Sequence, residues 1–211
     1  PKIILREITG NFPKCLISTF TEADFLFNMS NIAILPDKES ISLKYILSIL
    51  NSSLLSFYFI KNTAKSVRKM FPKIILNDLR KFLIKEISLD KQESFINKVD
   101  LMLEQHQNLL NEITNFLKTL KEEKGIVTVN KKIESFFELT FNDFKKELKK
   151  LKIEFSFGTE NDRWREYFNL TFSNVQQIQK QISYTDQEIN QMVYELYGLT
   201  EEEIKIVEES N

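Results

Sequence analysis

Residues 95–120 read FINKVDLMLEQHQNLLNEITNFLKTL, and the spacing of their apolar side chains decides the second half of the fold. Eight positions recur at alternating intervals of four and three, the a/d pattern of a helix that packs along one seam. These positions are Phe95, Val99, Met102, His106, Leu109, Ile113, Phe116 and Leu120. With Asp90 as the N-cap and Gly125 after the last turn, the pattern predicts one long helix in which His106 sets the register.

A second run with the same spacing follows later in the chain. Its seam positions are Val175, Ile178, Ile182, Thr185, Ile189, Met192 and Leu196. We expect this helix to pack antiparallel to the first, with a break near Tyr184 where Thr185 and Glu188 form a capping-box pattern. Two short amphipathic helices are predicted within residues 130–157. The cluster of Trp164, Tyr167 and Phe168 reads as core packing rather than a base-stacking platform.

The first half alternates short strand and helix signals. Strands are predicted over residues 3–8, 14–20 and 73–76, with two more short ones within 24–35. A helix that opens at Ser40 or Ser42 is followed by a second from Leu54 to about Ile60. The predicted fold class is α+β: a small mixed α/β domain over residues 1–89, and a long antiparallel, coiled-coil-like helical hairpin over 90–211.

Composition excludes several kinds of site. One Cys and one His among 211 residues rule out an internal disulfide framework and a His/Cys zinc site built from this chain alone. No phosphate-binding glycine motif and no zinc-protease or serine-hydrolase motif occurs, so we predict neither a catalytic residue nor a metal site. No apolar run is long enough for a membrane span. Because the chain opens at Pro1, we expect an excised fragment, with loss of an initiator Met as the alternative.

The net charge of −1 conceals an asymmetry between the two halves. Residues 1–91 carry 14 basic and 8 acidic side chains, and most of the surplus lies between Lys61 and Lys81, where Asp78 is the one acid. Such a local surplus favours a polyanionic partner, because the field that a phosphate meets is local. The alternative is an ordinary solvated helix face and loop.

Four stretches of sequence together resemble a known family. They are PKIILREI at 1–8, LKYILSILNS at 43–52 followed by SFYF at 56–59, FPKI at 71–74 leading to Asp78 and Leu79, and YELYGLTEEEIKIVE at 194–208. In this order they resemble the C-terminal part of TaqI-like adenine-N6 DNA methyltransferases, including the specificity region of type IIG restriction–modification enzymes. The resemblance covers nearly the whole chain.

The resemblance implies a target recognition domain joined to a helical spacer. In that family an upstream catalytic domain binds S-adenosylmethionine and holds the flipped adenine with an Asn-Pro-Pro motif. This sequence contains no Asn-Pro-Pro. We therefore expect no cofactor and no catalysis in this chain, double-stranded DNA and the parent's catalytic domain as its partners, no membrane, and a cytoplasmic location.

The residues expected to contact DNA fall in two segments. Lysines would neutralise phosphates, and forked or amide side chains would read base edges. The candidates are Arg6, Asn11 and Lys14 around the first turn, and Lys61, Asn62, Thr63, Lys65, Ser66, Arg68, Lys69 and Lys73 in the second segment. Two other functions stay open: a coiled-coil module for protein interaction or oligomerisation, and a free-standing enzyme of unknown type.

Overall fold

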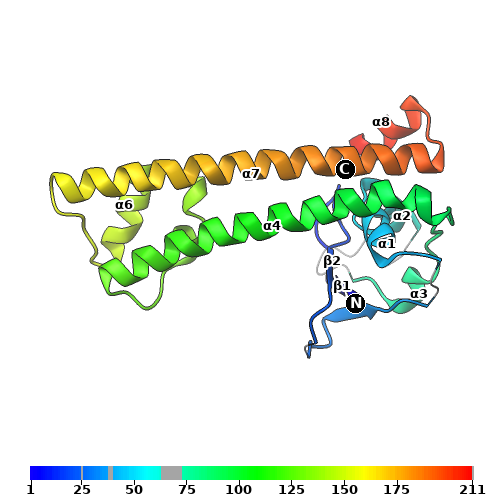
Figure 1. The fold of residues 1–211 in the computed structure, drawn as a ribbon, viewed down its shortest axis with the longest axis horizontal. Helices are drawn as coiled ribbons and strands as arrows, with labels where there is room; N and C mark the ends of the chain where they lie inside the picture. The colour runs from blue at the N-terminus through cyan, green and yellow to red at the C-terminus, as the bar shows by residue number, and fades with distance from the viewer. Residues whose placement is uncertain (25, 38–39, 63–72, 211) are drawn as a thin grey trace. The chain divides into compact units, whose positions relative to one another are not determined.

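The computed structural model describes residues 1–24, 26–37, 40–62 and 73–210. These residues form two compact units. Unit 1 combines residues 1–101 with 185–211, and unit 2 consists of residues 102–184. Figure 1 shows the elements of both units, including the two longest helices, which contribute to each of them. The predicted division into domains 1–89 and 90–211 stays a prediction.

A three-stranded antiparallel sheet in the order β2-β1-β3 opens unit 1. Its strands are β1 Lys2–Arg6, β2 Ser18–Thr21 and β3 Asn31–Ile34. Ile3 and Leu5, two residues apart on β1, are fully buried, as the period of two in a half-buried strand requires. The sheet therefore has one face on the core of unit 1, against which α1 packs.

The strand predictions for the first half are correct in part. The second strand begins at Ser18 rather than at residue 14, because the backbone from Gly10 to Cys15 closes a turn in which the Gly10 N–H donates to the Cys15 carbonyl at 2.8 Å. Residues 26–35 contribute one strand instead of two. The strand predicted over residues 73–76 is wrong: Lys73 makes an isolated bridge with Ile8, and α3 (Leu76–Leu79) follows.

Of the remaining helices of unit 1, α1 and α2 begin near the predicted caps, whereas the cap of α8 was not predicted. In α1 (Leu43–Leu50) the Ser42 side chain accepts the Lys44 N–H, and α2 (Ser53–Asn62) follows directly. The C-terminal helix α8 (Glu201–Glu209) opens with a complete capping box in which Thr200 and Glu203 satisfy each other's backbone N–H groups. The Thr200 cap lies in a sequence stretch that carries the family resemblance, and Ser42 directly precedes another.

Two long helices continue from unit 1 into unit 2. They are α4 (Leu89–Lys124) and α7 (Thr159–Tyr197), and neither contains a glycine or proline. α4 begins one residue before the predicted cap Asp90, because the Ser88 carbonyl accepts the Gln92 N–H. It ends at Lys124, and the φ of 61° at the following Gly125 lets the Ile126 N–H donate to the Lys121 carbonyl. The break expected near Tyr184 is absent, since α7 runs through it.

Unit 2 is built around an aromatic core. Its short elements α5 (Lys131–Glu134), the 3-10 turn η1 (Phe136–Glu138) and α6 (Phe141–Lys150) fill the interval predicted to hold two short helices. Phe116 of α4 is fully buried and its ring stacks on Phe136 with centroids 4.0 Å apart. Trp164 and Phe168 are also buried, as predicted. The Asn174 amide donates to the Glu112 carboxylate, and Lys124 pairs with Glu160, so α4 and α7 run antiparallel within this unit.

The predicted seam is not buried along its whole length. Phe95 and Val99 lie in the core of unit 1, and Phe116 and Leu120 in that of unit 2, whereas His106 between them is exposed. The expectation that His106 sets the register from inside a seam is therefore wrong. Supercoiling of the two helices stays a prediction.

Candidate nucleic-acid interface

Asn51, at the end of α1, links the sheet of unit 1 to that helix through hydrogen bonds. It caps the C-terminus of α1, and its side-chain amide pairs with the backbone of Ser18 on β2 as a neighbouring strand would. The Asn51 Oδ1 accepts the Ser18 N–H at 3.0 Å, and its Nδ2 donates to the Ser18 carbonyl at 2.9 Å. Ser56 of α2 accepts the Cys15 N–H at 3.1 Å. These bonds hold the strands and the first turn in fixed positions.

The backbone after β1 pairs with the chain around Lys73, the last residue of the second predicted basic segment. Ile8 and Lys73 form an antiparallel bridge, and the Ile74 N–H donates to the Glu7 carbonyl at 2.9 Å. Arg6 is exposed at the end of β1, directly before these paired residues. The Lys73 ammonium pairs with Glu7 at 2.7 Å, and about half of the Lys73 side chain stays exposed. Arg6 and Lys73 therefore sit close together along paired backbones although 66 positions separate Glu7 from Lys73.

Lys61 and Asn62 occupy the last turn of α2. Both residues are exposed. The Asn62 amide donates to the Tyr58 carbonyl at 2.9 Å, and the Lys61 ammonium lies 5.5 Å from the centre of the Phe57 ring. A cation at a helix C-terminus is favoured by the helix dipole, which gives Lys61 a structural reason for its position as well.

Asn11 and Lys14 lie on the first turn in different environments. Asn11 is exposed and its carbonyl accepts the Lys14 N–H at 3.0 Å. The Lys14 ammonium points into unit 1, where it donates to the Asn51 carbonyl at 2.8 Å and pairs with Asp186 of α7 at 2.9 Å. Burial lowers the pKa of Lys14, and the Asp186 carboxylate opposes that shift.

Five of the predicted contact residues lie outside the described residues. These are Thr63, Lys65, Ser66, Arg68 and Lys69. Whether any of the eleven predicted residues touches DNA stays a prediction.

The described residues show no group of three His, Cys, Asp or Glu side chains that could hold a metal ion. Cys15 is buried, and burial raises the pKa of its thiol, which disfavours the reactive thiolate. In the described part of the chain no single helix has the length and apolarity to cross a bilayer, although the bent pair α1 and α2 meets that test together.

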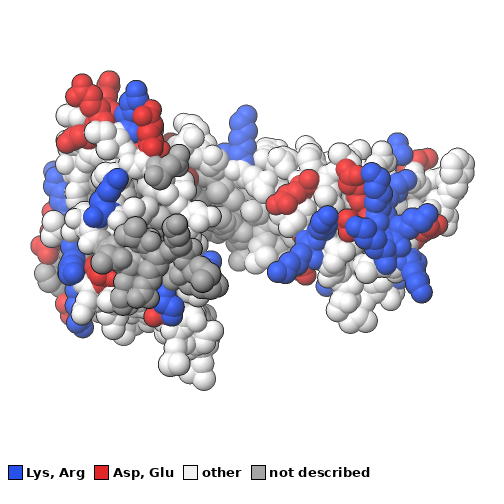
Figure 2. Space-filling view, turned by 180° about the vertical axis from the view of Figure 1, so that it is seen from behind, with Lys and Arg blue, Asp and Glu red and all other residues white. Residues whose placement is uncertain are grey.

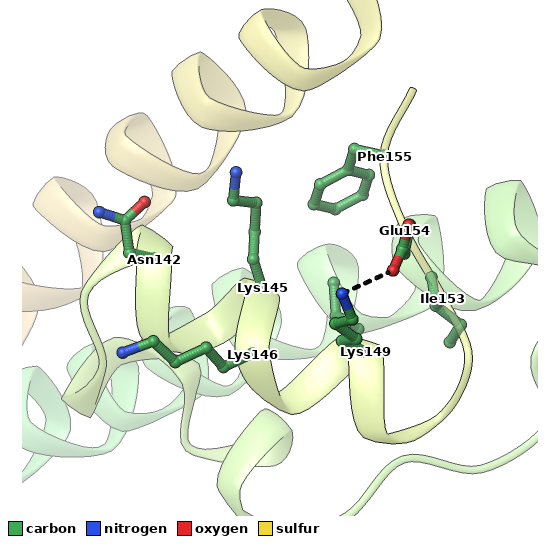
Figure 3. Close-up of a pocket in the computed structure, with 8 residues that line it drawn as sticks. Asn142, Lys145, Lys146, Lys149, Ile153, Glu154 and Phe155 are labelled. Carbon is green, nitrogen blue, oxygen red and sulfur yellow. Dashed lines mark ion pairs between the residues drawn. The ribbon is translucent and has the colours of Figure 1, made fainter. Parts of the chain in front are cut away.

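A lysine-rich pocket in unit 2 was not among the predicted sites. It has a volume of about 500 Å³, and its lining comes mainly from α6. Figure 3 shows the amines of Lys145, Lys146 and Lys149 leaving the helix around it, with the Phe155 ring beyond. Glu154 is the one acid in the lining and pairs with Lys149 at 3.2 Å. The hydrogen bond that the Lys146 ammonium donates to the Asp143 carboxylate raises the pKa of Lys146, so its ammonium is charged at neutral pH.

The signal for this pocket was present in the sequence. Lysines at 145, 146, 149 and 150 repeat at the i,i+4 spacing of one helix face. Acidic residues elsewhere in the second half outnumber the basic ones, so its net charge is negative. The net charge of the whole half therefore conceals this local positive surface. Figure 2 shows Lys and Arg side chains gathered in one area of unit 2, at the right of the view.

Comparison with known protein families assigns both parts of the chain. Residues 1–84 match the TaqI-like C-terminal specificity domain. Residues 88–193 match a domain of unknown function, DUF8810. Searches of the curated proteins and of the solved structures found no match. The first match confirms the resemblance drawn from the four sequence stretches over its N-terminal part. The chain therefore belongs to the DUF8810 family over residues 88–193 and carries a TaqI-like C-terminal specificity domain in residues 1–84.

Proposed function

We propose that residues 1–84 bind double-stranded DNA and recognise a specific sequence on behalf of a type IIG restriction–modification enzyme. The enzyme's catalytic domain would methylate adenine at N6 with S-adenosylmethionine, and this chain would position it without taking part in the chemistry. The observation that carries the proposal is the match of residues 1–84 to a TaqI-like specificity domain. We place the protein in the cytoplasm with its DNA.

Arg6 and Lys73 are the described residues best suited to bind phosphate. Both are exposed, and the bridge between Ile8 and Lys73 holds them close together on a backbone that is fixed to the sheet. Asn11 and Asn62 are exposed amides that can read a base edge through paired donor and acceptor atoms. Lys14 is left out of this interface because its ammonium is engaged by Asn51 and Asp186 inside unit 1.

The proposal is tested by measuring the binding of the full chain to duplex DNA over a range of salt concentrations. Fluorescence anisotropy of a labelled duplex gives the association constant at each concentration. The test variant is Arg6→Gln/Lys73→Gln. Lys91→Gln/Lys205→Gln is the charge-matched control, because both lysines are exposed in unit 1 on other elements. If both test residues contact phosphates, the slope of log K against log salt falls by about 1.8, at about 0.9 for each contact.

An unchanged slope in the test variant contradicts the assignment of Arg6 and Lys73. The variant Arg68→Ala/Lys69→Ala examines the segment outside the described residues in the same assay. A chain that binds no duplex even at low salt contradicts the DNA-binding proposal and favours the alternative of a helical interaction module.

Sequence specificity needs its own measurement. Selection of duplexes from a random pool by the full chain should enrich one short motif, because base-edge contacts discriminate by about 1–3 kcal/mol at each position. Binding that enriches no motif at any salt concentration contradicts a recognition role and leaves only attraction to the phosphate backbone.

A further inference from the structure

We propose that the lysine face of α6 in unit 2 is a second DNA-binding surface, which contacts the phosphate backbone without reading sequence. This inference deepens the proposed function and rests on it, since it assigns a role to the DUF8810 part of the chain. The surface is defined by Lys145, Lys146 and Lys149 around the pocket.

The charge of the pocket favours an anion. Three lysines and one glutamate line it, which leaves a surplus of two positive charges on a short stretch of one helix. The side chains of Lys146 and Lys149 are 73% and 77% exposed, so their ammonium groups can reach a partner. Their ion pairs with Asp143 and Glu154 are solvent-exposed and therefore weak, and phosphate can displace them at little cost.

The neighbourhood of the pocket adds to its positive potential. Lys145 lies 5.4 Å and Arg165 lies 5.5 Å from the centre of the Phe141 ring, so both cations border the same aromatic side chain. Lys145 also donates to Asn161 of α7 at 3.0 Å, which fixes the position of its ammonium. The surface therefore combines one positioned cation, Lys145, with the two exposed lysines Lys146 and Lys149.

The side-chain types argue for backbone contact rather than base reading. Lysine is a point charge on a flexible stem and suits phosphate, whereas base discrimination needs the forked donors of Arg or the amides of Asn and Gln. Asn142 is the one such residue in the lining. A duplex is the polyanion that the same chain would already hold through residues 1–84, so we commit to DNA phosphates as the ligand.

The test uses the full chain and the variant Lys146→Gln/Lys149→Gln. Both residues are exposed, and circular dichroism melting checks that the variant keeps its fold. The charge-matched control is Lys118→Gln/Lys205→Gln, which removes two exposed lysines from α4 and α8 that each pair with a glutamate four residues on. Random-sequence and selected duplexes are both measured, between about 50 mM and about 200 mM salt.

If both lysines contact phosphates, the salt slope falls by about 1.8, so the fourfold rise in salt weakens the variant about twelvefold less than the wild type. We expect the same fall in salt slope for random and selected duplexes, and the control variant should keep the wild-type slope. Protection of Lys146 and Lys149, but not Lys118, from acetylation in the presence of DNA supports the same assignment independently.

The possible failures are distinguishable. One outcome is that the salt slope of Lys146→Gln/Lys149→Gln equals that of the control, while the slope of Arg6→Gln/Lys73→Gln falls. That outcome overturns the inference and leaves the proposed function supported. A second outcome is that the salt slope falls in Lys146→Gln/Lys149→Gln, is unchanged in Arg6→Gln/Lys73→Gln, and no sequence is enriched. That outcome contradicts the recognition role and supports the α6 surface. A wild-type chain that binds no duplex at low salt overturns both.

Discussion

The Lys14 ammonium lies 2.9 Å from the Asp186 carboxylate and joins the first turn of the chain to the last part of α7. The same ammonium donates to the Asn190 Oδ1 at 3.1 Å, and that oxygen also accepts the Ser53 N–H at 3.0 Å. Residues from three distant parts of the sequence thus meet around one cation. This network explains why unit 1 includes residues 185–211 as well as residues 1–101.

The ion pair between Lys14 and Asp186 should stabilise unit 1. Asp186→Asn is expected to lower the free energy of unfolding at pH 7 by about 1 kcal/mol, a value limited because a third of each side chain reaches solvent. The folded-state pKa of Lys14 is lowered, so the stability that this group contributes rises with pH between that pKa and its unfolded value. Above the folded pKa the amine is neutral, and the penalty of the substitution should shrink.

Urea unfolding of both proteins at a series of pH values measures this effect. Glu93→Gln is the control, because Glu93 is exposed on α4 of the same unit. A penalty for Asp186→Asn that stays constant up to high pH would show that the charge on Lys14 is not what matters.

Asn51 should contribute more to the free energy of unfolding than an exposed asparagine does. Asn51→Ala removes two hydrogen bonds to the Ser18 backbone and one from the Ser18 hydroxyl. Leaving these partly buried groups unpaired is expected to cost about 2–3 kcal/mol in the free energy of unfolding. Chemical denaturation measures the cost, and Asn97→Ala on the exposed side of α4 provides a control that should change stability by less than about 0.5 kcal/mol. Equal values for the two variants would contradict the proposed linking role.

Glu160 should make unit 2 sensitive to acid. A hydrogen bond from the Lys124 ammonium, together with one from the Ser156 N–H at 2.7 Å, lowers the pKa of Glu160 to about 2. Because the folded pKa lies below the unfolded value, the stabilisation is present at neutral pH and is lost as the pH falls from about 4.5 toward about 2. Glu160→Gln should therefore lower Tm at pH 7. The difference in Tm between this variant and the wild type should become smaller in acid.

Differential scanning calorimetry at pH 7, 4 and 2.5 would follow this difference. Glu166→Gln, an exposed carboxyl two turns further along α7, serves as the comparison. Parallel Tm curves for wild type and Glu160→Gln across the whole range would refute the assigned pairing.

Phe116 should be the most costly single truncation in unit 2. Its ring is fully buried and contacts the rings of Phe136, Phe144 and Trp164 among others. Phe116→Ala is expected to cost about 3–5 kcal/mol in the free energy of unfolding, through lost burial and the cavity left behind. Phe157→Ala removes the same side chain from a fully exposed position and should be nearly neutral, and thermal melting of both variants compares them.

The sequence by itself determined the elements whose signals are local. The cap at Ser42, the glycine after α4, and the two long helices without glycine or proline were all predictable, because each depends on residues within a few positions. The α+β class and the TaqI-like specificity domain were predictable for the same reason: apolar spacing and short motifs are written in consecutive residues.

Only the tertiary structure decided what distant residues do to one another. Lys14 reads as a surface base in the sequence, but Asp186 and Asn51 draw its ammonium into unit 1. Thr185 looks like the start of a new helix, yet it is buried inside a continuous α7, because packing of an apolar face overrides a local capping signal. The strand predicted at Lys73 is reduced to one bridge with Ile8, since strand pairing depends on a partner that local propensity does not specify. The lysines of α6 form a surface for the same reason: charge acts through space, and the folded chain sets the distances.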